Sequence, residues 1–308
     1  MSPNCNTNNC VPDTRAIAAT VAKVLNTAKV PNVLWGWQVV SLLGVDYKYP
    51  VIIKPHIKKA SKTLAAAGYI RCIDAICSTK SNDDHPHLAA DEHFHSNAVH
   101  LHYDKDRRSA DFAGIRLYSK ARLLWWIPDN GLETMEDRAV DALLMSTTDA
   151  SIPEPEIGTW ASGTGRWNDV PDAGGVRVLR PALFFEALQL LMCLYYYDVE
   201  SQGNAFSEMW CGILLSEVND GVVQEIEAKL APEFRRVWEH DKKVQSEEER
   251  SMDTNFYPIL RLRERLLMGS LRQSTYHPPL PVENRVGTPQ LPELDVDPDY
   301  VVKRKRQG

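Results

Sequence analysis

Short apolar runs alternate with helical patterns over the first 127 residues, and this alternation limits the fold more than any other feature of the chain. A short apolar run between turn signals has the length of a buried strand. The strands expected on this ground are 33–35, 51–53, 69–73, 97–103 and 113–118. Apolar residues at helical spacing predict helices at 14–28, 37–43 and 57–67. The sequence therefore predicts an α/β (α+β) domain with a mixed sheet over residues 12–127.

The second half of the chain has a different character. Residues 151–175 hold three prolines and five glycines, so we expect residues 128–180 to form a linker or loop region. The helical patterns that follow are 181–199, 205–219, 222–243 and 254–273, which together predict a mostly helical domain over 181–275. A disordered N-terminus at 1–11 and a proline-rich, basic tail at 276–308 complete the expected organisation.

Composition limits the class of protein without naming an activity. Hydrophobic residues make up 44% and charged residues 25%, which is typical of a globular protein and excludes a mostly disordered or coiled-coil chain. The formal net charge of −6 argues against a protein that coats DNA. The first residues have neither a basic start nor an apolar core, so we expect a cytoplasmic protein with reduced cysteines and no membrane association.

A strand, a glycine turn and a helix are expected in the segment VLWGWQVVSLLGVD, residues 33–46. Backbone N–H groups at such a turn can hold a phosphate or a carboxylate. Together with AAGY at 66–69 and RLYSKARLLWWIP at 116–128, this order resembles fungal proteins of the nucleotidyltransferase-like superfamily over residues 14–127. The resemblance implies a nucleotidyltransferase-like mixed sheet.

The chain departs from that superfamily at the strand after the turn. Active nucleotidyltransferases carry two carboxylates there, one residue apart, which bind magnesium. The corresponding segment here, YPVIIKP, offers Lys54 as its charged side chain, and the nearest acid, Asp46, precedes the strand. We therefore expect neither a metal site, nor a cofactor, nor magnesium-dependent nucleotidyl transfer.

Two functions are compatible with a strand that lacks the two metal-binding carboxylates. The chain looks like the fungal arginine-containing cyclodipeptide synthases, and this resemblance implies a synthase that makes arginine-containing cyclic dipeptides from aminoacyl-tRNA. Its partners would be arginyl-tRNA and a second charged tRNA. That chemistry needs neither metal nor ATP, because the ester bonds are already activated. The alternative is a catalytically inactive member of the fold that acts as a binding or scaffold protein.

Several side chains could serve a synthase. Trp35, Gly36 and Trp37 would hold the aminoacyl-adenosine end, through backbone N–H groups and an indole face. Ser41 is a candidate acyl acceptor, or else a helix residue that faces solvent. Glu217 and, as a second choice, Glu186 project from apolar helix faces, where a carboxylate could clamp an arginine side chain or form a structural salt bridge.

The histidines form three His-x-His pairs. The pairs at 85/87 and 93/95 fall in a polar stretch, residues 78–96, which we expect to be a solvated loop. His100 and His102 fall on an expected strand, where both rings share one face and one could act as a general base. Tyr118 and Lys120 could assist from the adjacent strand end. For the His100/His102 pair, the alternatives are ligation of a transition metal, which would need further ligands, and simple strand packing or surface exposure.

Basic residues cluster although the net charge of the chain is negative, and two groups of them would contact tRNA phosphates. These residues are Lys54, Lys58, Lys59, Lys62, Arg261, Arg265 and Arg272. An ordinary solvated face is the alternative interpretation of each group.

Overall fold

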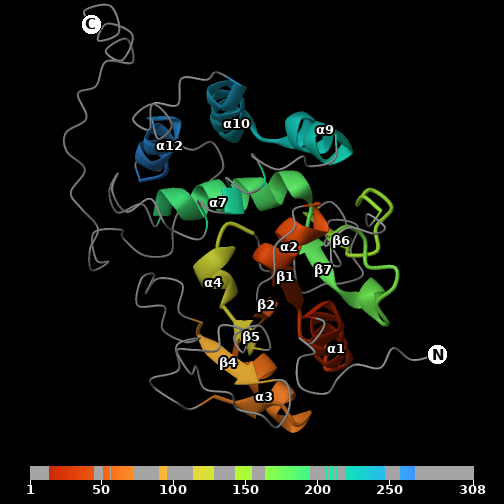
Figure 1. Ribbon diagram of the computed structural model, residues 1–308. Helices are drawn as coiled ribbons and strands as arrows, with labels where there is room; N and C mark the ends of the chain where they lie inside the picture. Colours follow the sequence, from red (N-terminus) through yellow and green to blue (C-terminus); the bar gives the residue numbers. More distant parts are fainter. Residues whose placement is uncertain are drawn as a thin grey trace, which may run out of the picture.

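The computed structural model describes most of the expected core of the chain (Figure 1). The described residues are 14–44, 51–55, 57–72, 90–95, 114–127, 143–154, 164–194, 206, 209, 210, 213, 220–246 and 257–267. Over these residues the protein is a mixture of helices and two small sheets, so the fold is α+β. No helix in this part of the chain is long and apolar enough to cross a membrane.

The larger sheet has five strands in the order β1-β2-β5-β4-β3. The strands are β1 (Asn32–Trp35), β2 (Val51–Pro55), β3 (Ile70–Arg71), β4 (Glu92–His95) and β5 (Gly114–Leu117). β2 and β5 run parallel in the middle of the sheet, whereas the β1–β2, β5–β4 and β4–β3 pairs are antiparallel. β5 therefore lies between β2 and β4, and its C-terminal end meets the start of β4.

Among the described residues, four helices accompany this sheet: α1 (Thr14–Thr27), α2 (Trp37–Leu42), α3 (Ile57–Ala66) and α4 (Lys120–Leu123). Both α1 and α3 pack against β2. The side chains that α1 buries are Ala18, Ala19, Val21, Ala22 and Leu25. Gly36 joins β1 to α2 with φ 82° and ψ −151°, a conformation that glycine adopts without the strain of a side chain. The expected helices and the strands at β1, β2 and β5 are confirmed, while β3 is shorter than expected.

The expectation of a loop over 78–96 is wrong at its C-terminal end. Residues 92–95 form β4, because His93 and Phe94 are buried against β5 despite the polar character of the stretch. The expected strand at 97–103 lies outside the described residues.

The expectation of a linker over 128–180 is wrong for its described residues, 143–154 and 164–180. They contain β6 (Leu144–Ser146), a short 3-10 helix η3 (Ala173–Gly175) and β7 (Arg177–Leu179), and β6 and β7 pair antiparallel. Asn26 in α1 donates a hydrogen bond to the Gly175 carbonyl at 2.8 Å. Buried apolar side chains, Ile152, Trp167, Val170, Val176 and Val178, hold this segment in the core in spite of its prolines and glycines.

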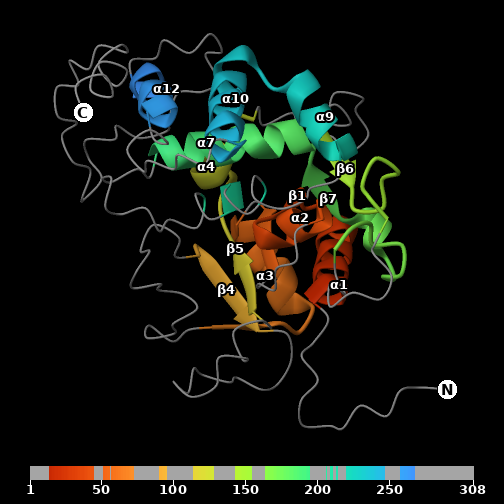
Figure 2. The ribbon, with the colours of Figure 1, turned by 45° about the horizontal axis from the view of Figure 1, so that its top comes forward.

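The remaining helices form a layer around α7 (Figures 1 and 2). They are α7 (Pro181–Leu194), α9 (Asp220–Lys229), α10 (Pro232–Ser246) and α12 (Tyr257–Leu267). α7 is buried on nearly all sides, between the sheets and the other three helices. The single helix expected at 222–243 is two helices, because Pro232 lacks an N–H and begins α10.

The two predicted domains share buried contacts. Trp35 of β1 packs edge-on against Phe184 of α7, with ring centroids 4.8 Å apart. Positions 206, 209, 210 and 213 of the expected helix 205–219 are helical. The rest of that helix and the terminal segments 1–11 and 276–308 lie outside the described residues, and the domain boundaries stay a prediction.

Candidate functional site

Polar side chains gather on β4 and β5. His93 of β4 pairs in register with Arg116 of β5, so the two side chains point to the same face of the sheet. His93 is only 2% exposed, and Arg116 is half-buried. A Cβ placed on Gly114 would lie 2.7 Å from His93 Nε2, so glycine at this position makes room for the imidazole ring.

Tyr118 follows directly after β5, and its ring is buried. Burial raises the pKa of the Tyr118 hydroxyl, while the nearby guanidinium groups of Arg116 and Arg122 act in the opposite direction. The Arg122 guanidinium lies 5.5 Å from the centroid of the Tyr118 ring. Because the net shift is upward, Tyr118 is a neutral phenol at neutral pH and can donate a proton or a hydrogen bond.

Asp91 fixes the start of α4 beside this tyrosine. Its Oδ2 accepts a hydrogen bond from the Ser119 N–H at 2.6 Å, and its Oδ1 lies 3.6 Å from Arg122 Nη1. Its own N–H donates to the Leu117 carbonyl at 3.0 Å. Lys120, the first residue of α4, is half-buried. We call these six residues the β5-end cluster: His93, Arg116, Tyr118, Lys120, Arg122 and Asp91.

The β5-end cluster combines three basic side chains with one carboxylate, a buried phenol and a buried imidazole. The cations can hold a phosphate or an oxyanion, the phenol can donate a proton, and the imidazole can accept one. Within the described part of the chain, no group of three or more His, Cys, Asp or Glu side chains is placed to hold a metal ion.

Two members of the cluster, Tyr118 and Lys120, were predicted as candidate site residues from the sequence. The other four were missed. Arg116 and Arg122 lie in the segment RLYSKAR, on either side of Tyr118 in the sequence. This arrangement of basic residues around a tyrosine could have indicated them as site residues. His93 and Asp91 could have been found only by treating Phe94 as the inward residue of a strand.

Trp35, directly before the glycine turn, lies level with Arg116 of the cluster and two strands away, because Trp35 pairs with Ile52 and Ile52 pairs with Arg116. β1 runs antiparallel to β2, which is parallel to β5, so the turn after β1 and the helix after β5 are at opposite edges of the sheet. Trp35 and Trp37 are both buried, and Trp35 packs on α7. The burial of both indoles does not favour the predicted stacking of the aminoacyl-adenosine end at this turn, and that role stays a prediction.

Ser41 and Glu186 also have structural surroundings. Ser41 is buried rather than facing solvent, and its carbonyl accepts a hydrogen bond from the Gly165 N–H at 3.1 Å. Glu186 is 3% exposed, which confirms that it lies on a buried helix face. Its Oε1 accepts the Ala231 N–H at 2.8 Å, so a backbone group bonds this carboxylate.

The basic residues predicted to contact tRNA fall into separate places. Lys58 and Lys62 on α3 are exposed, whereas Lys59 Nζ donates to the Lys29 carbonyl at 2.9 Å. On α12, Arg261 lies 3.6 Å from Glu264 and Arg265 lies 3.7 Å from Glu233. α3 and α12 lie at opposite ends of the molecule in both views (Figures 1 and 2). His100, His102, Glu217 and Arg272 lie outside the described residues, as does the side chain of Lys54 in β2.

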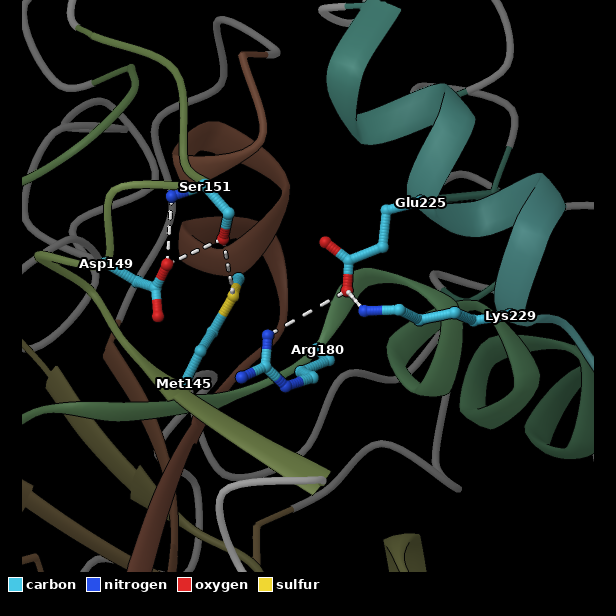
Figure 3. Close-up of polar contacts among 6 residues, drawn as sticks. All are labelled: Met145, Asp149, Ser151, Arg180, Glu225 and Lys229. Carbon is cyan, nitrogen blue, oxygen red and sulfur yellow. Dashed lines mark hydrogen bonds and ion pairs between the residues drawn. The ribbon is translucent and has the colours of Figure 1, made fainter.

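A second polar group joins the small sheet to the helical layer (Figure 3). Arg180, directly after β7, lies 4.0 Å from Glu225 of α9, and Lys229 lies 3.0 Å from the same carboxylate. Nearby, Ser151 donates to Asp149 through its N–H at 2.9 Å and its hydroxyl at 2.7 Å. These bonds lower the pKa of Asp149. Every charged group here has an opposite charge or a hydrogen-bond donor beside it, which is typical of contacts that stabilise the packing of neighbouring elements.

Comparison with known proteins supplies no relative, since no protein-family model, no curated protein and no solved structure matches the chain. The described residues establish the fold class, which is α+β.

Proposed function

We propose that this chain is an aminoacyl-tRNA-dependent synthase with a nucleotidyltransferase-like fold, which joins arginine and a second amino acid into a cyclic dipeptide. The β5-end cluster carries the proposal: a buried neutral phenol stands between two arginines, with a buried histidine on the same face of the sheet. These groups can transfer protons and stabilise an oxyanion, and both are needed when an amine attacks an ester.

The strand residues beside the cluster support chemistry without a metal. β2 reads VIIKP and the neighbouring β5 reads GIRL, so neither of these parallel strands offers a carboxylate. Arg116 of β5 pairs in register with Ile52 of β2, the strand on which an active nucleotidyltransferase would carry its two acids. A cationic centre suits substrates that arrive as activated esters and carry phosphates of their own.

The reaction consists of two acyl transfers. The amine nitrogen of one aminoacyl group attacks the ester carbonyl of the other, and the bond from that carbonyl carbon to the tRNA 3′ oxygen breaks. The dipeptidyl amine then attacks the remaining ester and closes the ring. In each step His93 takes the proton from the amine, Tyr118 donates one to the departing oxygen, and Arg116 and Arg122 stabilise the oxyanion.

Reconstitution tests this proposal. Purified protein is mixed with tRNA, arginine, arginyl-tRNA synthetase and a second charged amino acid, and cyclic products are measured by mass spectrometry. Product should form and should vanish after RNase treatment. Tyr118→Phe should lower kcat by about a hundredfold. Tyr69→Phe is the matched control, because burial also raises the pKa of this hydroxyl but it lies at the α3–β3 turn. Failure of all charged tRNA pairs would overturn the proposal.

A binding or scaffold protein is the second candidate. The observation in its favour is that Trp35, Ser41 and Glu186 all make contacts that hold the fold together. A binding or scaffold function predicts that no charged tRNA pair yields a cyclic product. It also predicts that Tyr118→Phe has no effect on binding of the partner.

A further inference from the structure

Three neighbouring strands of the large sheet bring their flanking segments together at one end of the sheet. β1 pairs antiparallel with β2 through Asn32 and Pro55, and β2 pairs parallel with β5 through Ile53 and Leu117. The start of β1 and the ends of β2 and β5 therefore lie at the same end of the sheet. Neighbouring strands are about 4.8 Å apart, so the three strand ends span about 10 Å.

Basic side chains occur beside each of these three strand ends. Lys29 lies three residues before β1, Lys58 and Lys59 lie in the first turn of α3 after β2, and Lys120 and Arg122 lie in α4 after β5. Lys59 Nζ donates to the Lys29 carbonyl at 2.9 Å, so the start of α3 is in contact with the segment before β1. We call these five residues the basic row: Lys29, Lys58, Lys59, Lys120 and Arg122.

The charge around the basic row is mostly of one sign. Residues 47–73 hold six lysines and arginines and no acid, although the net charge of the chain is −6. Lys29 and Lys58 are exposed, and within the described part of the chain neither ammonium group has an acidic partner. The acids at the start of β4, Asp91 and Glu92, are each paired with an arginine. The basic row therefore presents uncompensated positive charge.

A phosphodiester backbone matches such a surface. Exposed lysines bind phosphates as point charges, and this binding gains free energy from the release of counterions. Ligands of sheets with parallel strands lie outside the carboxyl ends of those strands, which is where the basic row lies. Lys120 and Arg122 also belong to the β5-end cluster, so a nucleic acid strand along the basic row would end beside Tyr118. By contrast, Arg261 and Arg265 of α12 each lie beside a glutamate that a phosphate would have to displace.

We propose that the basic row binds the phosphodiester backbone of the 3′ end of the charged tRNA. This inference rests on the proposed function and adds to it the surface along which the substrate reaches the site. The phosphates follow the basic row from Lys29 to Arg122, and the aminoacyl ester lies at Tyr118. The arginines of α12 take no part in this contact.

Binding of uncharged arginine tRNA to the full-length protein, measured by fluorescence anisotropy at several salt concentrations, tests the inference. Lys29→Gln and Lys58→Gln should each weaken binding about fivefold at about 0.1 M salt, and each should lower the slope of log affinity against log salt by about one. Both variants should melt at the wild-type temperature, because neither ammonium group loses an acidic partner. Lys243→Gln is the matched control, since Lys243 is an exposed lysine of α10, which lies at the other end of the molecule from α3 in both views (Figures 1 and 2).

A second probe locates the contact on the RNA. Arginine tRNA without its single-stranded 3′ nucleotides should bind wild type more weakly than intact tRNA, and Lys29→Gln and Lys58→Gln should not weaken binding of this probe further. Equal losses for the intact and truncated tRNA would overturn the inference, and so would an equal loss for Lys243→Gln. Wild-type protein that binds no tRNA would overturn it as well.

The reconstitution reaction separates this inference from the proposed function. If Lys29→Gln and Lys58→Gln bind intact tRNA like wild type while wild type forms cyclic product, the basic row is wrong and the synthase stands. If both variants lose binding of the 3′ end but no charged tRNA pair gives product, the basic row stands and the proposed reaction is wrong.

Discussion

The carboxylate of Glu186 in α7 accepts a hydrogen bond from the backbone N–H of Ala231, 2.8 Å away and 45 residues further along the chain. Ala231 directly precedes α10, so the bond satisfies a backbone donor where one helix ends and the next begins. Glu186 is buried, and an unpaired carboxylate at this position would be costly. The acid therefore fixes the turn between α9 and α10.

Replacing Glu186 separates this structural role from a role in binding arginine. Glu186→Leu leaves the Ala231 N–H without its acceptor and should lower the free energy of unfolding by about 1–3 kcal/mol. Glu186→Gln keeps an oxygen acceptor and should lose less. Urea denaturation measures both. If Glu186→Gln abolishes arginine incorporation in a folded protein, the carboxylate contacts substrate as well.

The burial of Glu186 was predictable, but its partner was not. Helical spacing placed Glu186 on an apolar face, and the structure confirms that face. The bond to Ala231 depends on how α9 and α10 return over α7, which no local pattern encodes. The break at Pro232 was also missed. The helical spacing of apolar residues over 222–243 predicted one helix, whereas the missing N–H of Pro232 indicated that a new helix begins there.

The expectations of a loop over 78–96 and of a linker over 128–180 missed β4 and the small sheet for a related reason. Polar composition around His93 suggested solvent, yet this ring is buried because Gly114 on the neighbouring strand leaves space for it. Prolines and glycines in 151–175 suggested a linker, although Trp167 and Val170 supply apolar surface for burial. Of the candidate site, Tyr118 and Lys120 were predictable from local sequence, whereas His93 required the register between β4 and β5.

Gly114→Ala tests the close approach of His93. The new Cβ would lie 2.7 Å from Nε2, so the ring must shift, and we expect a loss of about 1–3 kcal/mol in the free energy of unfolding. Gly174→Ala is the control, because its Cβ would meet only Thr148 Oγ1 at an ordinary 3.7 Å. Chemical denaturation measures both variants. In a double-mutant cycle, His93→Ala should relieve most of the cost of Gly114→Ala, and an additive result would contradict the contact.

Asp149 should make stability depend on pH in acid (Figure 3). Hydrogen bonds from the Ser151 N–H and hydroxyl hold the pKa of Asp149 below its ordinary value. A carboxyl whose pKa is lower in the folded state stabilises the protein above its unfolded-state pKa, and this contribution is lost as pH falls through the folded-state pKa. Ser151→Ala should therefore reduce the difference in stability between neutral and acidic pH, measured by urea denaturation across a pH series. An unchanged difference would show that the hydroxyl does not contribute.

Asp241 should produce the opposite dependence. Burial raises the pKa of this carboxyl, although Trp210 Nε1 donates to it at 2.8 Å and His240 lies beside it. Because the folded state holds the proton more tightly than the unfolded chain, this contribution is fully present below the unfolded-state pKa and is lost as pH rises through the folded-state pKa. Asp241→Asn keeps an oxygen that can accept the Trp210 N–H but no longer titrates. The stability of the variant relative to wild type should therefore increase as pH rises from acid to neutral, measured by thermal unfolding at each pH. A relative stability that decreases over this range would mean that hydrogen bonding to Trp210 and His240 outweighs burial at Asp241.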